Sequence, residues 1–460
     1  MFRRVLRLLW LVGFFLCVHA SVQFDSGMNP WSRWAAMASF AETGTPQIDH
    51  YRLHTVDWAL APDGHYYSNK PPGPILLGLP LFLLFDQART QGLPTLEERD
   101  VVRVVEREDI LHLLAMVLQA VPYAIAVLLA MALLAEYSVP PEGMRFACIA
   151  LLFGSTGSLL MNSYFGHGMA VLFVLATWLA LCRQRPLLVG LFFGLAVTCD
   201  YASTLLGLPV FVWLWLNHPQ RVRALAWCAL GGLGPFILFG AYHWYCFGGP
   251  FTSPNQFQNP MFIDPVVEDA NLWGMLRLLP PIKRVKSLLF GTHRGILWTQ
   301  PWVLVAVPAL AFALYRNRKS LEPRAVLVRR ATAFALASFF LVFWMNSGFN
   351  GYHGGYSPGP RYLSITFAPL ALAIGLSYSA FPVWLRQALD LALFGAVLLF
   401  LLVFSTEILL TPPEAIAPFY FHQFLTGHVG LHAARFVCMA LPLLFATWQV
   451  VGRRTVPSPA

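Results

Sequence analysis

The chain has 460 residues, of which 57% are hydrophobic and only 12% are charged. Soluble domains are about half apolar and roughly a quarter charged, so the composition excludes an ordinary water-soluble protein and indicates a membrane protein. The formal net charge is +9, but the 31 Lys and Arg are dispersed between apolar runs. This dispersal excludes the basic stripe of a nucleic-acid-binding protein and favours cytoplasmic loops that face anionic lipid.

Residues 1–21 form the first predicted membrane helix. They combine a basic start with an apolar run, as a signal peptide does, but no small-x-small cleavage site precedes the polar residues that begin at Gln23. We therefore expect an uncleaved helix with a cytoplasmic N-terminus. A bacterial inner (plasma) membrane fits best, because nothing in the chain resembles an organelle-targeting segment.

Apolar stretches that approach the roughly 20 residues needed to cross a bilayer recur along the whole chain. In order, the candidates are 5–21, 73–86, 109–135, 146–162, 166–182, 187–199, 203–216, 224–246, 296–314, 331–346, 362–380, 389–408 and 432–451. The positive-inside rule then places the loops at 22–72, 247–295, 347–361 and 409–431 outside the cell membrane. An odd number of candidates separates the first loop from the third, so either 73–86 or 187–216 is not counted correctly. We expect an all-α polytopic protein with about 12–13 transmembrane helices.

The chain is predicted to be a single integral-membrane domain over residues 1–460. Its parts are a first helix (1–21), a periplasmic loop (22–72), a helical membrane core (73–246), a second periplasmic loop with a juxtamembrane helix (247–295), C-terminal membrane helices (296–451) and a tail (452–460). Two amphipathic surface helices are predicted in the external loops, at 29–44 and 272–290. In each, Arg or Lys alternates with aromatic or leucine side chains, as in helices that lie at a membrane interface.

Three external loops each place a cation at the entrance to a membrane helix. These cations are Lys70 in DGHYYSNKPPGP, Arg294 in FGTHRGILWTQP and Arg361 in GFNGYHGGYSPGPRYLSI. Glycines and prolines fix the backbone there, and an ammonium or guanidinium at the membrane surface suits a lipid phosphate. The alternative for each residue is a side chain that only anchors the end of a helix. Similarly, His353 is either a proton carrier or a polar loop residue.

Two ionisable residues interrupt the apolar region, His167 in SYFGHGMA and Asp200 in TCDYAST. Ionisable groups at membrane depth are costly and tend to mark function, although both residues can also lie in short loops near the surface. Transfer of a group to a hydroxyl further needs a carboxylate that takes the proton. The external candidates are Asp25, Asp49, Asp57 and Asp63, and the residues alone do not rank them.

Six short motifs occur along the chain in a specific order. They are Ser32-Arg33-Trp34, Gly44 to Asp49, Asp63 to Gly73, Phe165-Gly166-His167, Asp200-Tyr201 and Gly359 to Leu363. With these motifs, most of residues 1–380 resembles the membrane glycosyltransferases of the GT-C fold. The resemblance is to the family 39-like group that includes the protein O-mannosyltransferases and the lipid A aminoarabinose transferases.

This resemblance implies a GT-C-like helical bundle and a sugar donor linked to polyprenyl phosphate. It implies that Lys70 contacts the donor phosphate and that Arg33, Arg294 and Arg361 support it. An aspartate of the first loop acts as the base, and the reaction inverts the sugar's configuration. Because Asn29 and Pro30 stand where relatives have an acidic residue, the nearest upstream carboxylate, Asp25, is the first candidate for the base and Asp57 the second.

Further substrate contacts are expected near these residues. The candidates are Asp49, Asp63, His65, Tyr66, Tyr67, Asn69, His167, Asp200, His293, His353 and Tyr362. No cofactor is assigned. Some relatives bind a divalent metal, but Asn69 stands here where many of them have Asp or Glu before the lysine, which weakens the case for a metal.

The expected partners are a polyprenyl-phosphate sugar donor and an acceptor that is a lipid, a glycan or a protein, without nucleic acid. Two other functions remain open at this point. A transporter or flippase of lipid-linked sugars would use the same cations without a base. A non-catalytic GT-C-like membrane protein would have a degraded site, as Asn29 and Asn69 suggest. The sequence does not identify the sugar or the acceptor.

Overall fold

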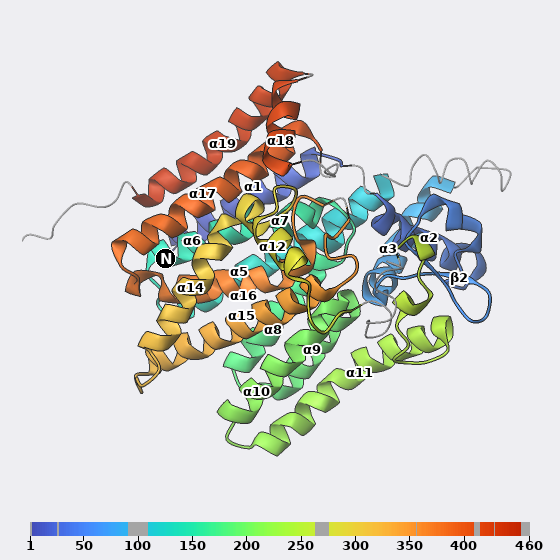
Figure 1. The fold of residues 1–460 in the computed structure, drawn as a ribbon, viewed down its shortest axis with the longest axis horizontal. Coiled ribbons are helices and arrows are strands. Elements are labelled where there is room, and N and C mark those ends of the chain that lie inside the picture. Colours follow the sequence, from blue (N-terminus) through green and yellow to red (C-terminus); the bar gives the residue numbers. More distant parts are fainter. Residues whose placement is uncertain are drawn as a thin grey trace, which may run out of the picture.

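The structure is a computed structural model that describes residues 2–24, 27–90, 109–262, 276–355, 357–408, 415–426 and 428–451. In this part of the chain, five helices are long and apolar enough to cross a membrane, or up to seven if two bent helix pairs each count as one span. Six shorter apolar helices accompany them. The protein is therefore all-α with the helices of a multi-pass membrane protein, whereas the expected 12–13 crossings remain a prediction (Figure 1).

The helices follow one another with short connections. They are α1 (Phe2–Ser21), α2 (Met28–Thr43), α3 (Pro72–Thr90), α5 (Val121–Glu136), α6 (Pro141–Phe153), α7 (Thr156–Leu159), α8 (His167–Cys182), α9 (Pro186–Cys199), α10 (Gly207–Asn217), α11 (Arg221–Phe247), α12 (Ile282–Phe290), α13 (Ile296–Thr299), α14 (Pro301–Arg316), α15 (Pro323–Gly348), α16 (Ser364–Ser377), α17 (Val383–Thr406), α18 (Ile416–Leu425) and α19 (Val429–Val451). A π-helical turn, η2 (Met116–Ala120), lies within the apolar helix Asp109–Glu136 that ends with α5. The 3₁₀ turns used below are η1 (Asp49–His54), η4 (Tyr201–Leu206) and η8 (Arg361–Leu363).

The described part contains one two-stranded sheet, the antiparallel pair β1 (Trp58–Leu60) and β2 (Tyr66–Ser68). The turn between the strands includes Gly64 at a φ of 85°, a left-handed conformation that suits glycine. We call the end of the helical bundle that carries this hairpin the hairpin end. In Figure 1 it lies at the right.

Most predicted spans coincide with helices, and the differences have local causes. The segment 146–162 is bent by 43° between α6 and the turn that follows it, where Gly154 and Ser155 interrupt the helix. The segment 296–314 is divided at Gln300 before Pro301, because proline disfavours a helical residue in front of it. The predicted loop 409–431 contains α18. The predicted surface helix 272–290 is shorter than expected: only Ile282–Phe290 is helical, after Pro280 and Pro281, and residues 272–275 lie outside the described part.

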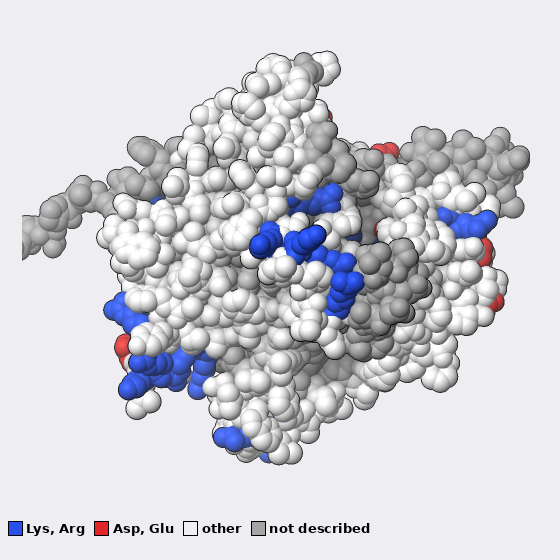
Figure 2. All heavy atoms as spheres, in the orientation of Figure 1, with Lys and Arg blue, Asp and Glu red and all other residues white. Residues whose placement is uncertain are grey.

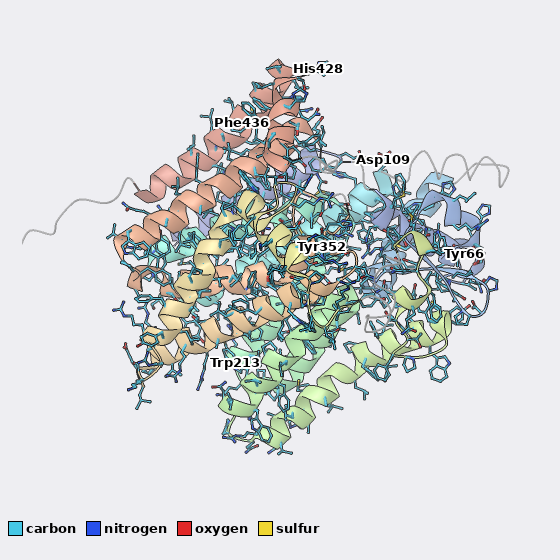
Figure 3. All side chains as sticks on the ribbon, in the orientation of Figure 1. Tyr66, Asp109, Trp213, Tyr352, His428 and Phe436 are labelled. Atoms are coloured by element: carbon cyan, nitrogen blue, oxygen red, sulfur yellow. The ribbon has the colours of Figure 1, made fainter. Side chains whose placement is uncertain are left out.

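The hairpin end shows why the expected count of crossings had the wrong parity. Gln23, just after α1, donates a hydrogen bond from Nε2 to Oδ1 of Asp109 at 3.2 Å, and Asp109 begins the next long apolar helix. Residues 23–109 therefore start and finish at the same end of the bundle. Figure 3 shows Asp109 and Tyr66 toward that end and Trp213 toward the other. Hence α3, which covers the candidate 73–86, adds no net crossing, and an even number of spans separates 22–72 from 347–361.

The opposite end of the bundle carries the basic connections that the positive-inside rule assigns to the cytoplasm. Arg183 pairs with Glu136 at 3.1 Å, and Arg316 donates to the carbonyl of Ala380 at 2.9 Å. A cavity of about 200 Å³ at this end is lined by residues that include Asn217 and Arg330. Lys and Arg gather where α14 meets α15, at the lower left of Figure 2. The basic connections thus share one end, as the rule expects.

The predicted surface helix at 29–44 is the helix α2, but it is largely buried. Trp34 and the alanines and methionine that follow it to Ala38 are completely buried, and Trp34 packs edge-on against Phe82 of α3. Apolar residues occupy every side of this part of the helix, so it packs inside the protein rather than lying with one face on a membrane. Its C-terminal cap is Gly44, with a φ of 72°.

Candidate functional site

Close backbone contacts bring three of the sequence motifs together. A Cβ placed on Gly73 would lie 2.6 Å from the carbonyl oxygen of Thr198, and one on Gly166 would lie 2.7 Å from Pro74 and 2.8 Å from the oxygen of Cys199. Gly166 also has a φ of 92°. Only glycine allows these approaches without displacement. The segments around Lys70, His167 and Asp200 are therefore packed against one another at the hairpin end.

Lys70 stands between β2 and α3 and forms an ion pair with Asp57. Its Nζ lies 3.0 Å from Oδ1 of Asp57, and the two side chains are 13% and 14% exposed. Burial lowers the pKa of Lys70 to about 8, although Asp57 opposes this effect and the nearby Arg361 and Arg33 add to it. The lysine is thus a partly desolvated cation whose charge is held by one carboxylate.

Ser32 fixes the position of that carboxylate. Its hydroxyl donates to the backbone carbonyl of Asp57 at 2.6 Å and lies 2.7 Å from the hydroxyl of Ser68. The backbone N–H of Lys70 in turn donates to the Ser68 hydroxyl at 3.4 Å. The Ser-Arg pair of α2 therefore ties both partners of the ion pair to one helix.

Arg33, the next residue of α2, is 2% exposed. Its Nη2 donates to the carbonyl of Phe165 at 2.7 Å, and its Nη1 donates to the backbone and side chain of Asn29, while Nε is buried without a partner. Burial lowers the pKa of Arg33 to about 10, with a further contribution from Arg361, so the guanidinium stays charged at neutral pH. The chain has placed a buried cation among neutral acceptors.

Arg361 enters the same region from η8 and is 8% exposed. Its guanidinium carbon lies 4.7 Å from the centre of the Phe165 ring, a cation–π arrangement. Positive φ angles at Gly354 and Gly355 allow the loop before it to fold closely over its side chain. Phe165 thus receives Arg33 on its carbonyl and Arg361 on its ring.

Arg294 joins this group through His353. Its Nη1 donates to Nδ1 of His353 at 3.3 Å and to the backbone carbonyl at 3.1 Å, and Nδ1 also accepts the N–H of Gly355 at 3.0 Å. Burial lowers the pKa of His353, and Arg294 and Arg361 lower it further. His353 is therefore a neutral acceptor that fixes the loop, and its contacts favour positioning over proton transfer.

The cations at this site outnumber the carboxylates that meet them. In the described residues, neither Arg33 nor Arg361 has a carboxylate within 4.0 Å, and Lys70 has only Asp57. Unpaired charge that is nearly buried is costly, and a bound anion would remove that cost. We call Arg33, Lys70 and Arg361 the cation cluster.

His167 and Asp200, the ionisable pair expected at membrane depth, contact each other beside this cluster. Nδ1 of His167 lies 2.9 Å from Oδ2 of Asp200, and the N–H of Ala202 donates to Oδ1 at 3.0 Å. The His167 ring stacks on Phe165 with centroids 5.9 Å apart. The carboxylate thus holds the imidazole ring, and the pair is part of the same packed region.

One residue of the site was missed by sequence reasoning. The Tyr201 hydroxyl lies 3.2 Å from the Lys70 carbonyl, to which it donates, and 3.2 Å from Nε2 of His243, whose Nδ1 contacts the carbonyl of Thr252 at 2.9 Å. His243 lies inside an apolar helix near Gly248. Its histidine type alone, at the end of a span, was the available signal.

Several expected substrate contacts instead stabilise the hairpin. His65 pairs with Asp49 at 3.2 Å, and the Tyr67 hydroxyl donates to Asp63 at 2.8 Å. Tyr66 receives a hydrogen bond from Arg52 on its hydroxyl at 3.1 Å. Asp49, Asp63 and His65 are exposed, and their printed contacts are local to the hairpin and η1. Their roles here are structural.

The remaining candidates divide in the same way. Asn69 is buried beside Lys70 with Oδ1 unpartnered, Tyr362 packs its ring against Phe349, and His293 is exposed in a turn next to Arg294. Asp25, the first candidate for the base, lies outside the described residues. Within those residues, no three His, Cys, Asp or Glu side chains are grouped so as to hold a metal ion.

Comparisons with known proteins add no family to this geometry. No protein-family model matches the chain, and no curated protein matches it.

Proposed function

We propose that this protein is a glycosyltransferase of the GT-C type. It moves a sugar from a polyprenyl-phosphate-linked donor to a hydroxyl of a lipid, glycan or protein. In this proposal the hairpin end faces the periplasm, the N-terminus is cytoplasmic and the membrane is the bacterial inner membrane. The distribution of basic connections to the opposite end supports this orientation.

The observation that carries the proposal is the cation cluster itself. Arg33 and Arg361 are 2% and 8% exposed and have no carboxylate partner in the described residues. Charge-assisted hydrogen bonds from a guanidinium fit the oxygens of a phosphate, and a desolvated lysine adds a third donor. A phosphate monoester or diester at a membrane surface is the anion that such a site selects.

The chemistry follows from the neighbouring carboxylate. The bond between the sugar's anomeric carbon and the phosphate oxygen breaks, and the cation cluster stabilises the polyprenyl phosphate that leaves. The acceptor oxygen attacks the same carbon from the opposite face, and its proton passes to Asp57. The products are the glycosylated acceptor and polyprenyl phosphate, with the sugar's configuration inverted.

The ion pair between Lys70 and Asp57 links donor binding to this proton transfer. In the free protein the carboxylate is held by the ammonium at 3.0 Å. When a donor phosphate takes a share of the Lys70 charge, that contact weakens and Asp57 becomes a better acceptor for a proton. The base is thus available mainly when the donor is bound.

A genetic experiment separates transfer from transport. A deletion strain is compared with its parent by analysis of all envelope glycans, and it is complemented with wild type, Asp57→Asn, Lys70→Ala or Lys319→Ala. Lys319 is an exposed cation at the opposite end and serves as the control. We expect the deletion to remove one sugar, which wild type and Lys319→Ala restore and the two site variants do not. Restoration by Asp57→Asn alone would favour a transporter, and an unchanged glycan profile in the deletion strain would contradict both.

A further inference from the structure

A second basic feature at the hairpin end lies outside the cation cluster. It is formed by α12 and the residues just before it, 278–290, and we call it the α12 surface. Lys and Arg gather over this helix near the centre of Figure 2. None of its lysines contacts Lys70, Arg33 or Arg361 in the described contacts, so the proposed sugar transfer does not use them.

The outward side of the α12 surface mixes apolar and basic side chains. Leu279, Ile282 and Phe290 are 88%, 65% and 55% exposed, and Lys283 and Lys286 are exposed between them. Ile282, Lys286 and Phe290 follow one another at four-residue spacing and so share one side of the helix. A helix that faces only water does not expose large apolar residues in such a row, whereas a helix at a membrane interface does.

The inner side of the same helix is fixed to the protein. Arg284 donates from Nη1 to the carbonyls of Gly348 at 3.3 Å and Phe349 at 3.1 Å, and its guanidinium lies 5.3 Å from the centre of the Tyr352 ring. Leu288 is 3% exposed. Figure 3 shows Tyr352 close to this helix. The exposed side is therefore held in place and is not a consequence of a loosely attached segment.

Two tryptophans mark the level of a membrane interface at the two ends of the surface. Nε1 of Trp344 donates to the carbonyl of Leu278 at 2.9 Å, and Nε1 of Trp298 donates to that of Phe290 at 3.2 Å. Tryptophan is enriched where hydrocarbon meets the headgroup layer. In the described residues no carboxylate pairs with Lys283 or Lys286, so their charge is available to an external anion.

From these observations we infer that the α12 surface binds the headgroups of anionic glycerophospholipids in the leaflet at the hairpin end. The leucine, isoleucine and phenylalanine side chains insert among the acyl chains, and Lys283 and Lys286 contact headgroup phosphates. The attraction of each basic residue to an anionic lipid surface is about 1 kcal/mol. The two lysines together therefore predict roughly a tenfold or greater preference for an anionic over a zwitterionic headgroup at this position.

Native mass spectrometry of the full chain tests this inference. The protein is purified in mild detergent with an equal mixture of phosphatidylglycerol and phosphatidylcholine, and retained lipids are counted. We expect Lys283→Gln/Lys286→Gln to lose at least one retained phosphatidylglycerol with no change in phosphatidylcholine. The charge-preserving control Lys283→Arg/Lys286→Arg should match wild type.

The measurement does not depend on sugar transfer, so it succeeds or fails independently of the proposed function. If the neutralised double variant fails to fold, the single variants Lys283→Gln and Lys286→Gln are used, each with a smaller loss expected. Unchanged phosphatidylglycerol retention in a folded neutralised variant would overturn the inference. Equal loss of both lipids would also overturn it, because that result indicates apolar anchoring or contact with a second copy of the chain.

Discussion

Lys70 differs from an ordinary surface lysine because it is partly desolvated and lies close to two buried arginines. These surroundings lower its pKa to about 8 despite the ion pair with Asp57. The protonated form binds phosphate, so affinity is full below about pH 8 and declines as the pH rises through that value. Arg33, whose pKa is lowered only to about 10, stays charged over most of this range.

We therefore predict a pH dependence that belongs to one residue. Binding of a short polyprenyl phosphate should weaken by roughly tenfold per pH unit above pH 8 if only the charged lysine binds. Lys70→Arg should bind without this break, because an arginine at that position keeps its charge to a higher pH. Isothermal titration between pH 6.5 and 9.5 measures both. A wild-type affinity that is constant up to pH 9.5 would rule out Lys70 as the ligand.

Arg361 supplies a second prediction at the residue scale. Its nearest described partners are aromatic rings, and its charge repels Lys70 and Arg33. Arg361→Met keeps most of the apolar stem but removes the charge. The lost cation–π contact, about 0.5–2 kcal/mol, is offset by relief of this repulsion, so the midpoint of thermal unfolding should change by only a few degrees.

Binding of polyprenyl phosphate should nevertheless fall at least tenfold in Arg361→Met. Thermal unfolding and binding are measured on the same preparation. A large loss of thermal stability together with unchanged phosphate affinity would assign Arg361 a structural role instead.

At the scale of elements, the site depends on how closely helices approach one another. Gly166 stands at the start of α8, where a Cβ would lie 2.7 Å from Pro74 and 2.8 Å from the oxygen of Cys199, at a φ that disfavours any side chain. The strain of that conformation is about 1–2 kcal/mol, and overpacking adds about 1–3 kcal/mol.

Gly166→Ala should therefore lower the free energy of unfolding by about 2–5 kcal/mol. The matched control is Gly234→Ala in α11, where nothing lies within 4 Å of the added Cβ. It should be neutral or slightly stabilising, because alanine favours a helix more than glycine does. Unfolding of the two variants in the same detergent gives the comparison, and equal stability of both would show that the close packing around Gly166 is not important.

The sequence predicted the elements better than their contacts. Hydropathy located nearly every helix, because long apolar runs have no other stable form in lipid. It did not decide whether the short, proline-rich 73–86 crosses, since that depends on where Gln23 and Asp109 meet. It also missed α18, which is shorter than a span, and it described α2 as a surface helix although Trp34 and its neighbours are buried.

The site was predictable in part for the same reason. Lys70, Arg33 and Arg361 were chosen as cations at helix entrances, and the structure brings them together. The ion pair of Lys70 with Asp57, the position of His243 and the local role of Asp49 and Asp63 depend on folding between distant segments. No pattern in a single sequence encodes those distances.

For the whole molecule, the distribution of charge predicts an orientation. The basic connections between the long helices lie at the end opposite the hairpin, so the hairpin end should face the periplasm. Cysteines introduced at Arg52 and Lys319 report on the two ends, because both residues are exposed. The exposed native Cys17 and Cys438 are first replaced by serine.

In intact cells, a membrane-impermeant maleimide should label Arg52→Cys and should leave Lys319→Cys unlabelled until the membrane is opened. The opposite labelling pattern would place the cation cluster in the cytoplasm, and the proposed periplasmic reaction would then be wrong.

The central claim is that the cation cluster holds the phosphate of a polyprenyl lipid. The most direct measurement is a cryo-electron microscopy structure of the full chain with a polyprenyl phosphate, alongside a control with the uncharged polyprenol. We predict phosphate density within about 3 Å of Lys70 Nζ and of the guanidiniums of Arg33 and Arg361, absent with the polyprenol. Phosphate density elsewhere on the protein, with these three side chains free of it, would contradict the claim.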